Sequence, residues 1–75
     1  MLEGIALSQP ALSLAAKILQ RAERAGVAVP LPAGSGLGET LLWLVADARS
    51  QGLDPEAALR RSALELAAEI RRAET

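Results

Sequence analysis

The chain of 75 residues contains no cysteine and no histidine. Disulfide bonds are therefore excluded, and so are the common zinc sites, which need thiolates or imidazoles. A catalytic Ser-His-acid arrangement is excluded as well, because no imidazole is present to activate a hydroxyl group. The lack of cysteine fits a cytoplasmic protein. The fold must be held together without disulfide or zinc cross-links.

Aromatic side chains are almost absent, since Trp43 is accompanied by no phenylalanine or tyrosine. Few rings are left to stack on nucleic-acid bases. The net charge is −1, and the eight basic residues are spread along the chain. We therefore expect no nucleic-acid partner. No apolar run approaches the roughly 20 residues that span a bilayer, and Met1-Leu2-Glu3 lacks the basic start of a secretory signal. We expect no membrane partner either.

Apolar residues, in contrast, make up 51% of the chain. A chain this short buries only about 60% of its unfolded surface. Small domains commonly compensate with disulfides, a structural metal or oligomerisation. The first two are excluded in their common forms, so oligomerisation remains. We expect a homo-oligomer, a dimer or a higher assembly.

Apolar residues recur at a helical period in three segments, and no alternating strand pattern is present. We predict an all-α fold of one domain, residues 1–75, with helices over about residues 10–25, 36–51 and 55–73. The linker over residues 27–35 contains two prolines, which favour an extended path. The expected assembly is an oligomeric helical bundle with three helices from each chain.

Local signals predict where these helices end and begin. Gly26 is expected to end the first helix in the left-handed conformation, and Gly52 is expected to end the second helix. Ser35 is the expected N-cap of the second helix. Glu56 and Arg60 are four residues apart, so we expect them to pair on the solvent-exposed face of the third helix.

The second predicted helix carries the run LLWLVA over residues 41–46, which is apolar around the whole circumference. Such a helix must be buried on more than one side, and the chain has only two other helices to cover it. We therefore expect a shared core, with one face inside the subunit and another against a partner. Trp43 is expected to be a packing anchor, with a base-stacking platform as the alternative. The residues expected in the core and oligomer interface are Leu41, Trp43, Leu44, Val45, Leu59, Leu66 and Ile70.

A few polar residues are candidates for a site. Lys17 and Arg21 are one turn apart on the first helix and could hold phosphates, although a solvated helix face explains them equally well. Glu39 and Asp47 are eight residues apart, roughly 12 Å along a helix. That separation is too large for the two carboxylates to share one metal ion.

Two segments resemble the MazG-type nucleoside triphosphate pyrophosphohydrolases. Residues 41–62, LLWLVADARSQGLDPEAALRRS, are similar to the last helix pair of that family. Residues 10–27, PALSLAAKILQRAERAGV, are similar to its first helix. The two segments occur in the family's order and cover more than half of the chain. The resemblance implies a MazG-like, all-α fold whose subunits pack into multi-chain bundles.

The same resemblance implies an activity and a metal site. The family hydrolyses (d)NTPs to the monophosphate and pyrophosphate, and its Mg²⁺ needs several converging carboxylates. Its motifs are E-E-x-x-E on an acidic helix and E-x-x-D at the start of the hydrophobic helix. Here residues 27–38, VAVPLPAGSGLG, contain no acid, and residues 36–39 read Gly-Leu-Gly-Glu. Glu39 alone occupies a position of a family metal ligand.

We therefore expect a non-catalytic MazG-like oligomerisation or binding module that has no cofactor and no catalytic residue. The alternative is a minimal Mg²⁺-dependent nucleoside triphosphate pyrophosphohydrolase that completes its site with a partner chain. In that case Glu39 would bind Mg²⁺, and Lys17 or Arg21 would bind phosphates. A further possible partner is a full-length MazG-like protein in mixed oligomers.

Overall fold

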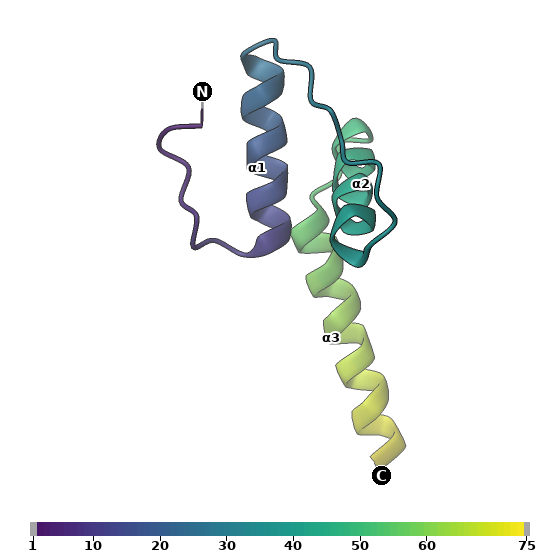
Figure 1. Cartoon of the computed structure of the whole chain (residues 1–75). Helices are drawn as coiled ribbons and strands as arrows, with labels where there is room; N and C mark the ends of the chain where they lie inside the picture. The colour runs from purple at the N-terminus through teal and green to yellow at the C-terminus, as the bar shows by residue number, and fades with distance from the viewer. Residues whose placement is uncertain (1, 75) are drawn as a thin grey trace.

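The computed structural model describes residues 2–74, and within these residues the regular structure is helical throughout. Helix α1 spans Ala11–Arg24, α2 spans Leu37–Ser50 and α3 spans Pro55–Glu74. Helices α1 and α2 form a body, and α3 extends away from it (Figure 1). The prediction of an all-α chain with three helices is confirmed. None of the described helices is both long and apolar enough to cross a membrane.

The two glycines end their helices as predicted. Gly26 has φ +69° and Gly52 has φ +72°, both in the left-handed region that favours glycine. The backbone N–H of Val27 then donates to the Ala22 carbonyl at 2.9 Å, which closes the last turn of α1. The same type of bond closes α2 after Gly52. The positions at which α1 and α2 end are therefore determined by the local sequence.

The starts of α2 and α3 differ in how they are capped. Gly36, not Ser35, is the N-cap of α2, and it makes no side-chain capping bond, so the prediction for Ser35 is wrong. Helix α3 has a true side-chain cap. The Asp54 carboxylate accepts hydrogen bonds from the backbone N–H groups of Glu56 and Ala57 at 3.0 and 3.1 Å. A cap of this kind stabilises a helix by about 1 kcal/mol.

The core of the body is small. Among the described residues, the buried hydrophobic side chains are Leu19 and Ala22 on α1 and Val45 on α2. An ion pair between Arg49 and Glu23, 2.9 Å long, also connects the two helices. Because this pair is partly exposed, it contributes little to stability. The contact between α1 and α2 therefore depends mainly on a few apolar side chains.

The linker between α1 and α2 is attached to α2 by Trp43. The indole N–H donates to the Pro32 carbonyl at 2.9 Å, while about half of the residue, 51%, stays exposed. Because proline has no backbone N–H group, a proline-rich linker can form few backbone hydrogen bonds of its own. The structure thus places Trp43 at the linker, where its indole N–H is satisfied and about half of the residue remains exposed.

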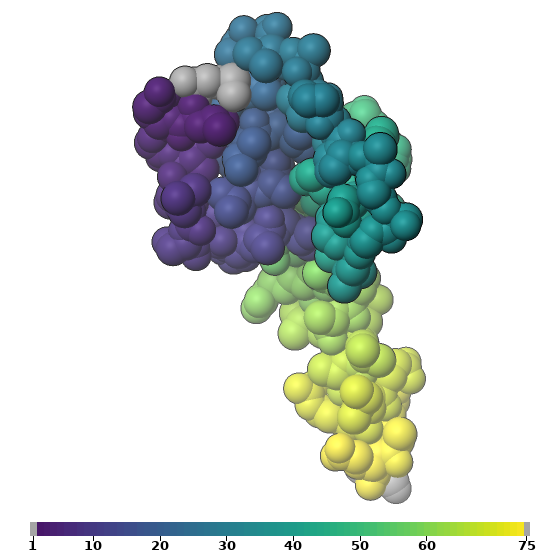
Figure 2. All heavy atoms as spheres, viewed as in Figure 1, coloured from purple at the N-terminus to yellow at the C-terminus, as the bar shows by residue number. Residues whose placement is uncertain are grey.

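Helix α3 makes the chain elongated. The radius of gyration is 15.2 Å, whereas a compact domain of this length has about 11 Å. No residue of α3 is buried, and the helix projects from the body as a separate extension (Figure 2). Within one chain, the three helices therefore do not form a closed bundle.

The core assignment can be tested by shortening Val45, which is only 1% exposed. We expect Val45→Ala to lower the free energy of unfolding by about 1–3 kcal/mol, through lost burial and a residual cavity. Val27→Ala removes the same atoms from a half-exposed loop residue. It should change the free energy of unfolding by less than about 0.5 kcal/mol. Urea unfolding followed by circular dichroism at one protein concentration measures both. Equal losses would show that Val45 is not the centre of the core.

Candidate functional site

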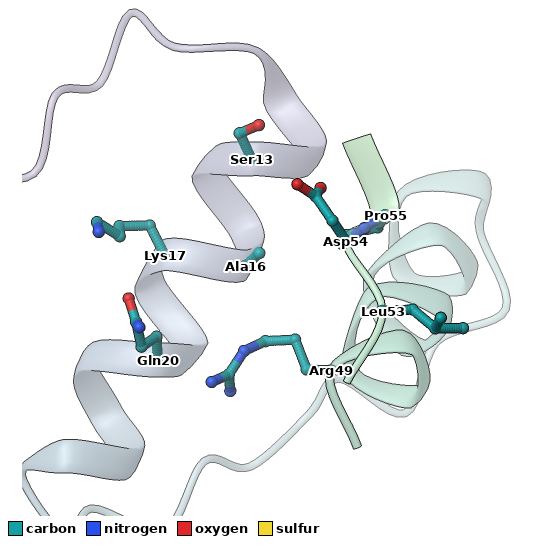
Figure 3. A pocket seen from close by; sticks show the side chains of 8 residues that line it. All are labelled: Ser13, Ala16, Lys17, Gln20, Arg49, Leu53, Asp54 and Pro55. Atoms are coloured by element: carbon teal, nitrogen blue, oxygen red, sulfur yellow. The ribbon is translucent and has the colours of Figure 1, made fainter. Parts of the chain in front are cut away.

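An open pocket lies between α1 and the turn that joins α2 to α3. Its volume is about 250 Å³, and it is shown from close by in Figure 3. Among the residues predicted to bind phosphate, Lys17 contributes to it. The residues that line the pocket are Ser13, Ala16, Lys17, Gln20, Arg49, Leu53, Asp54 and Pro55.

The two cations of this pocket do not converge. In Figure 3, the Lys17 side chain extends away from Asp54, whereas Arg49 reaches from α2 toward α1. The guanidinium of Arg49 donates to the Glu23 carboxylate at 2.9 Å. Since Glu23 neutralises Arg49 and Asp54 adds a further negative charge, the pocket does not present a paired positive site to a phosphate.

Arg21, the other predicted phosphate ligand, is absent from the lining of this pocket. Its guanidinium donates to the backbone carbonyl of Glu3 at 2.9 Å. This bond attaches the N-terminal segment to α1. Although Lys17 and Arg21 are one turn apart on α1, their side chains therefore have different surroundings.

Glu39, the predicted metal ligand, is the third residue of α2. Its carboxylate lies against Gly34 and Gly36, so closely that a side chain at Gly36 would collide with it. An acid at this position is favoured by the free N–H groups and the dipole of the helix start. Within residues 2–74, no three His, Cys, Asp or Glu side chains are grouped so that they could hold a metal ion. Glu39 thus lies in the first turn of α2, with its carboxylate against the preceding linker.

A polar contact that the sequence did not predict connects α3 to α1. The Glu56 carboxylate accepts hydrogen bonds from the backbone N–H of Ser13 at 3.2 Å and from its hydroxyl at 3.4 Å. Ser13 is in the first turn of α1, where the N-cap Pro10 supplies no side-chain bond. Glu56 thus satisfies a free N–H at the positive end of α1. The expected pairing of Glu56 with Arg60 is wrong.

One signal for this contact was present in the sequence. The first turn of α1 contains no acid, and proline has no side-chain acceptor with which to cap it. The free N–H groups of this turn are left to water or to an acceptor from elsewhere in the chain, and the sequence does not show which of the nine acids would supply it. Ser13 and Glu56 are 43 positions apart, so only the packing of α3 against α1 identifies the acceptor.

The residues predicted for the core and interface divide into two groups. Val45 is buried between α1 and α2, so it belongs to the core of the single chain. The others are between 40% and 61% exposed. Nothing within the described part of the chain covers them as a core would. These exposed residues are Leu41, Trp43, Leu44, Leu59, Leu66 and Ile70.

Some of the exposed apolar residues of α2 and α3 form two rows, to which we give names. The α2 stripe consists of Leu37, Leu41 and Leu44, at spacings of four and three. Leu37, which we did not predict as an interface residue, is its most exposed member. The α3 seam consists of five residues that repeat at spacings of four and three along one helix face. Its members are Leu59, Ala63, Leu66, Ile70 and Ala73.

An apolar hollow of about 230 Å³ opens beside the α2 stripe. Leu41 belongs to both features, while Ala11 and Gly38 contribute small surfaces to the hollow. A second hollow of about 280 Å³ lies between α1, the linker and Leu42. The contact between α1 and α2 is therefore incompletely filled on both sides. The chain thus exposes a large apolar surface, whereas its polar pocket does not form a selective site.

Comparisons with known proteins give one relative. No family model matches the chain, and no solved structure matches it significantly. The chain is similar to an uncharacterised 26.1 kDa protein of the blaB 3′ region of Streptomyces cacaoi, with 52% identity over 62 residues. The match covers 81% of this chain and 26% of the relative. The chain thus spans about a quarter of the relative's length, and the similarity assigns no activity to it.

The contact between Glu56 and Ser13 can be tested by removing its acceptor. We expect Glu56→Ala to lower the free energy of unfolding by about 1 kcal/mol, the usual effect of losing a helix cap. Glu65→Ala is the matched control, because Glu65 is an exposed acid of the same helix. Thermal and urea unfolding measure both variants. If the two substitutions have the same effect, the Glu56 carboxylate does not stabilise α1.

Proposed function

We propose that this chain is a non-catalytic helical oligomerisation module that associates with further copies of itself through the α3 seam and the α2 stripe. The observation that carries the proposal is the exposure of α3. This helix has 20 residues and no buried side chain, while Leu59, Leu66 and Ile70 are exposed along one face. Most helical stability in proteins comes from packing of an apolar face. A partner on the seam would supply that packing.

The accessible surface of the chain supports the same proposal. The chain exposes 5688 Å², whereas a compact protein of its mass exposes about 4,400 Å². The excess is therefore roughly 1,300 Å². A standard interface covers about 800 Å² on each partner, and obligate homodimers cover more. The excess surface is thus of the size that a stable interface between two copies would cover.

The resemblance to MazG-type enzymes supports a particular origin for the module. Residues 10–27 and 41–62 carry that resemblance, and they include α1, most of α2 and the start of α3. In place of the acidic helix, the chain has an extended linker that contains no acid. We propose that the helices used for packing are retained and that the Mg²⁺ centre is lost. The turn of Glu39 toward Gly36 supports this view.

Two leucines of α3 offer a matched test of the interface. Leu66 is in the seam and 61% exposed, whereas Leu64 is 56% exposed and lies about 160° away around the helix. We expect Leu66→Glu to weaken association at least about tenfold, because a charge would be buried in an apolar contact. Leu64→Glu should leave association unchanged. Sedimentation velocity over a dilution series measures both.

Neither substitution should unfold the single chain, since both side chains are exposed in it. Circular dichroism of the two variants serves as the control for folding. A folded wild-type chain that remains monomeric at high micromolar concentration would refute the proposed function. Equal weakening by both substitutions would show that the seam is not the contact face.

The alternative, a minimal pyrophosphohydrolase, is tested by its product. We expect no pyrophosphate release above background from a panel of (d)NTPs with Mg²⁺ or Mn²⁺, because the described residues offer no group of three ligands for the metal. A coupled pyrophosphate assay measures the rate. Release that Glu39→Gln abolishes would overturn the proposal and favour an enzyme that completes its site with a partner chain.

A further inference from the structure

We propose that two copies of this chain pair through their α3 seams in antiparallel orientation, an inference that rests on the proposed function and adds a geometry to it. The seam repeats at spacings of four and three from Leu59 to Ala73, which is the a/d pattern of a coiled coil. At 1.5 Å per residue, it is roughly 21 Å long. All five seam residues are exposed along this length.

The sizes of the seam residues favour the antiparallel orientation. In an antiparallel pair centred between Ala63 and Leu66, Leu59 of one copy lies opposite Ile70 of the other. Ala63 lies opposite Leu66 of the other copy, so every small residue in these layers meets a large one. A parallel pair in register would instead place Ala63 against Ala63 and Leu66 against Leu66. Close packing favours the arrangement whose layers have similar volumes.

The charges beside the seam favour the same orientation. In a parallel coiled coil, the residues that flank the seam meet five positions apart. Glu69 of each copy would then lie next to Glu74 of the other, and two pairs of like charges would repel. In the antiparallel pair, Glu69 lies near Ser62 and Arg60 lies near Ala67. No like charges meet at these flanking positions.

The shape of the molecule also favours the antiparallel orientation. Helix α3 leaves the body at one end and projects beyond it (Figures 1 and 2). Parallel pairing would bring the two bodies to the same end of the helix pair, where they compete for space. Antiparallel pairing places the bodies at opposite ends. It also brings the last turn of each α3 to the base of the partner's body, near the end of α1 that contains Ser13.

The absence of cysteine allows a direct test with single-cysteine variants. Leu59→Cys and Ile70→Cys are prepared separately, then incubated alone and as an equimolar mixture in a glutathione redox buffer. In the antiparallel pair, residues 59 and 70 of different copies are neighbours. Two copies of the same position lie roughly 16 Å apart along the axis, beyond the reach of a disulfide, whose Cα atoms are about 4.4–6.8 Å apart.

We therefore expect disulfide-linked dimers on a non-reducing gel from the mixture, at least about fivefold more than from either variant alone. Leu64→Cys, mixed with each variant, is the control for random collision and should give background levels. Cross-links from Leu59→Cys alone and from Ile70→Cys alone would overturn the antiparallel pair in favour of a parallel one. Background levels in every mixture of an oligomeric protein would overturn pairing through α3.

Sedimentation under reducing conditions distinguishes a failure of the proposed self-association from a wrong orientation of the helix pair. If the wild type and the cysteine variants are monomers at the concentration of the test, the proposed function itself fails. If they are oligomers and the cross-links do not follow the antiparallel pattern, the proposed function remains and only the orientation is wrong.

Discussion

The arrangement of the chain depends on the contact between the Glu56 carboxylate and the first turn of α1. Helix α1 begins after Pro10 without a side-chain cap, so its free N–H groups are left to water or to an acceptor from elsewhere. Glu56 supplies this acceptor at 3.2 Å from the backbone nitrogen of Ser13. Asp54, two residues earlier, caps α3. One short turn therefore ends α2, starts α3 and fixes the start of α3 against α1.

This attachment has a consequence for packing. Because α3 is held at its first turn, the rest of the helix extends past the body and finds no neighbour within the chain (Figure 1). Leu19, Ala22 and Val45 then form the whole set of buried hydrophobic residues between positions 2 and 74. A core of this size supplies little stability for 75 residues. The exposed apolar residues of α2 and α3 are the surface that the proposed self-association would cover.

The sequence predicts the features that depend on a few neighbouring residues. The three helices follow from apolar periodicity, and Gly26 and Gly52 end α1 and α2 because only local backbone conformation is involved. The sequence did not predict features that depend on tertiary contacts. Glu56 binds Ser13 instead of Arg60 because α3 meets α1 at its first turn. The sequence also did not predict which apolar helix faces are buried within the single chain. The apolar period of a helix is the same whether its face packs within the chain or against another chain.

Glu39 shows how one carboxylate position can serve either of two purposes. A metal ligand must direct its oxygens outward, toward a cation that other acids also reach. A helix-end residue directs them back, toward the free N–H groups at the start of its own helix. In this chain, the Glu39 carboxylate lies against Gly34 and Gly36, and a side chain at Gly36 would have to push it aside. The same glycines lie in the linker that replaces the acidic helix in the proposed ancestry. The proposed loss of the Mg²⁺ centre rests on this position of Glu39 and on the absence of acids from the linker.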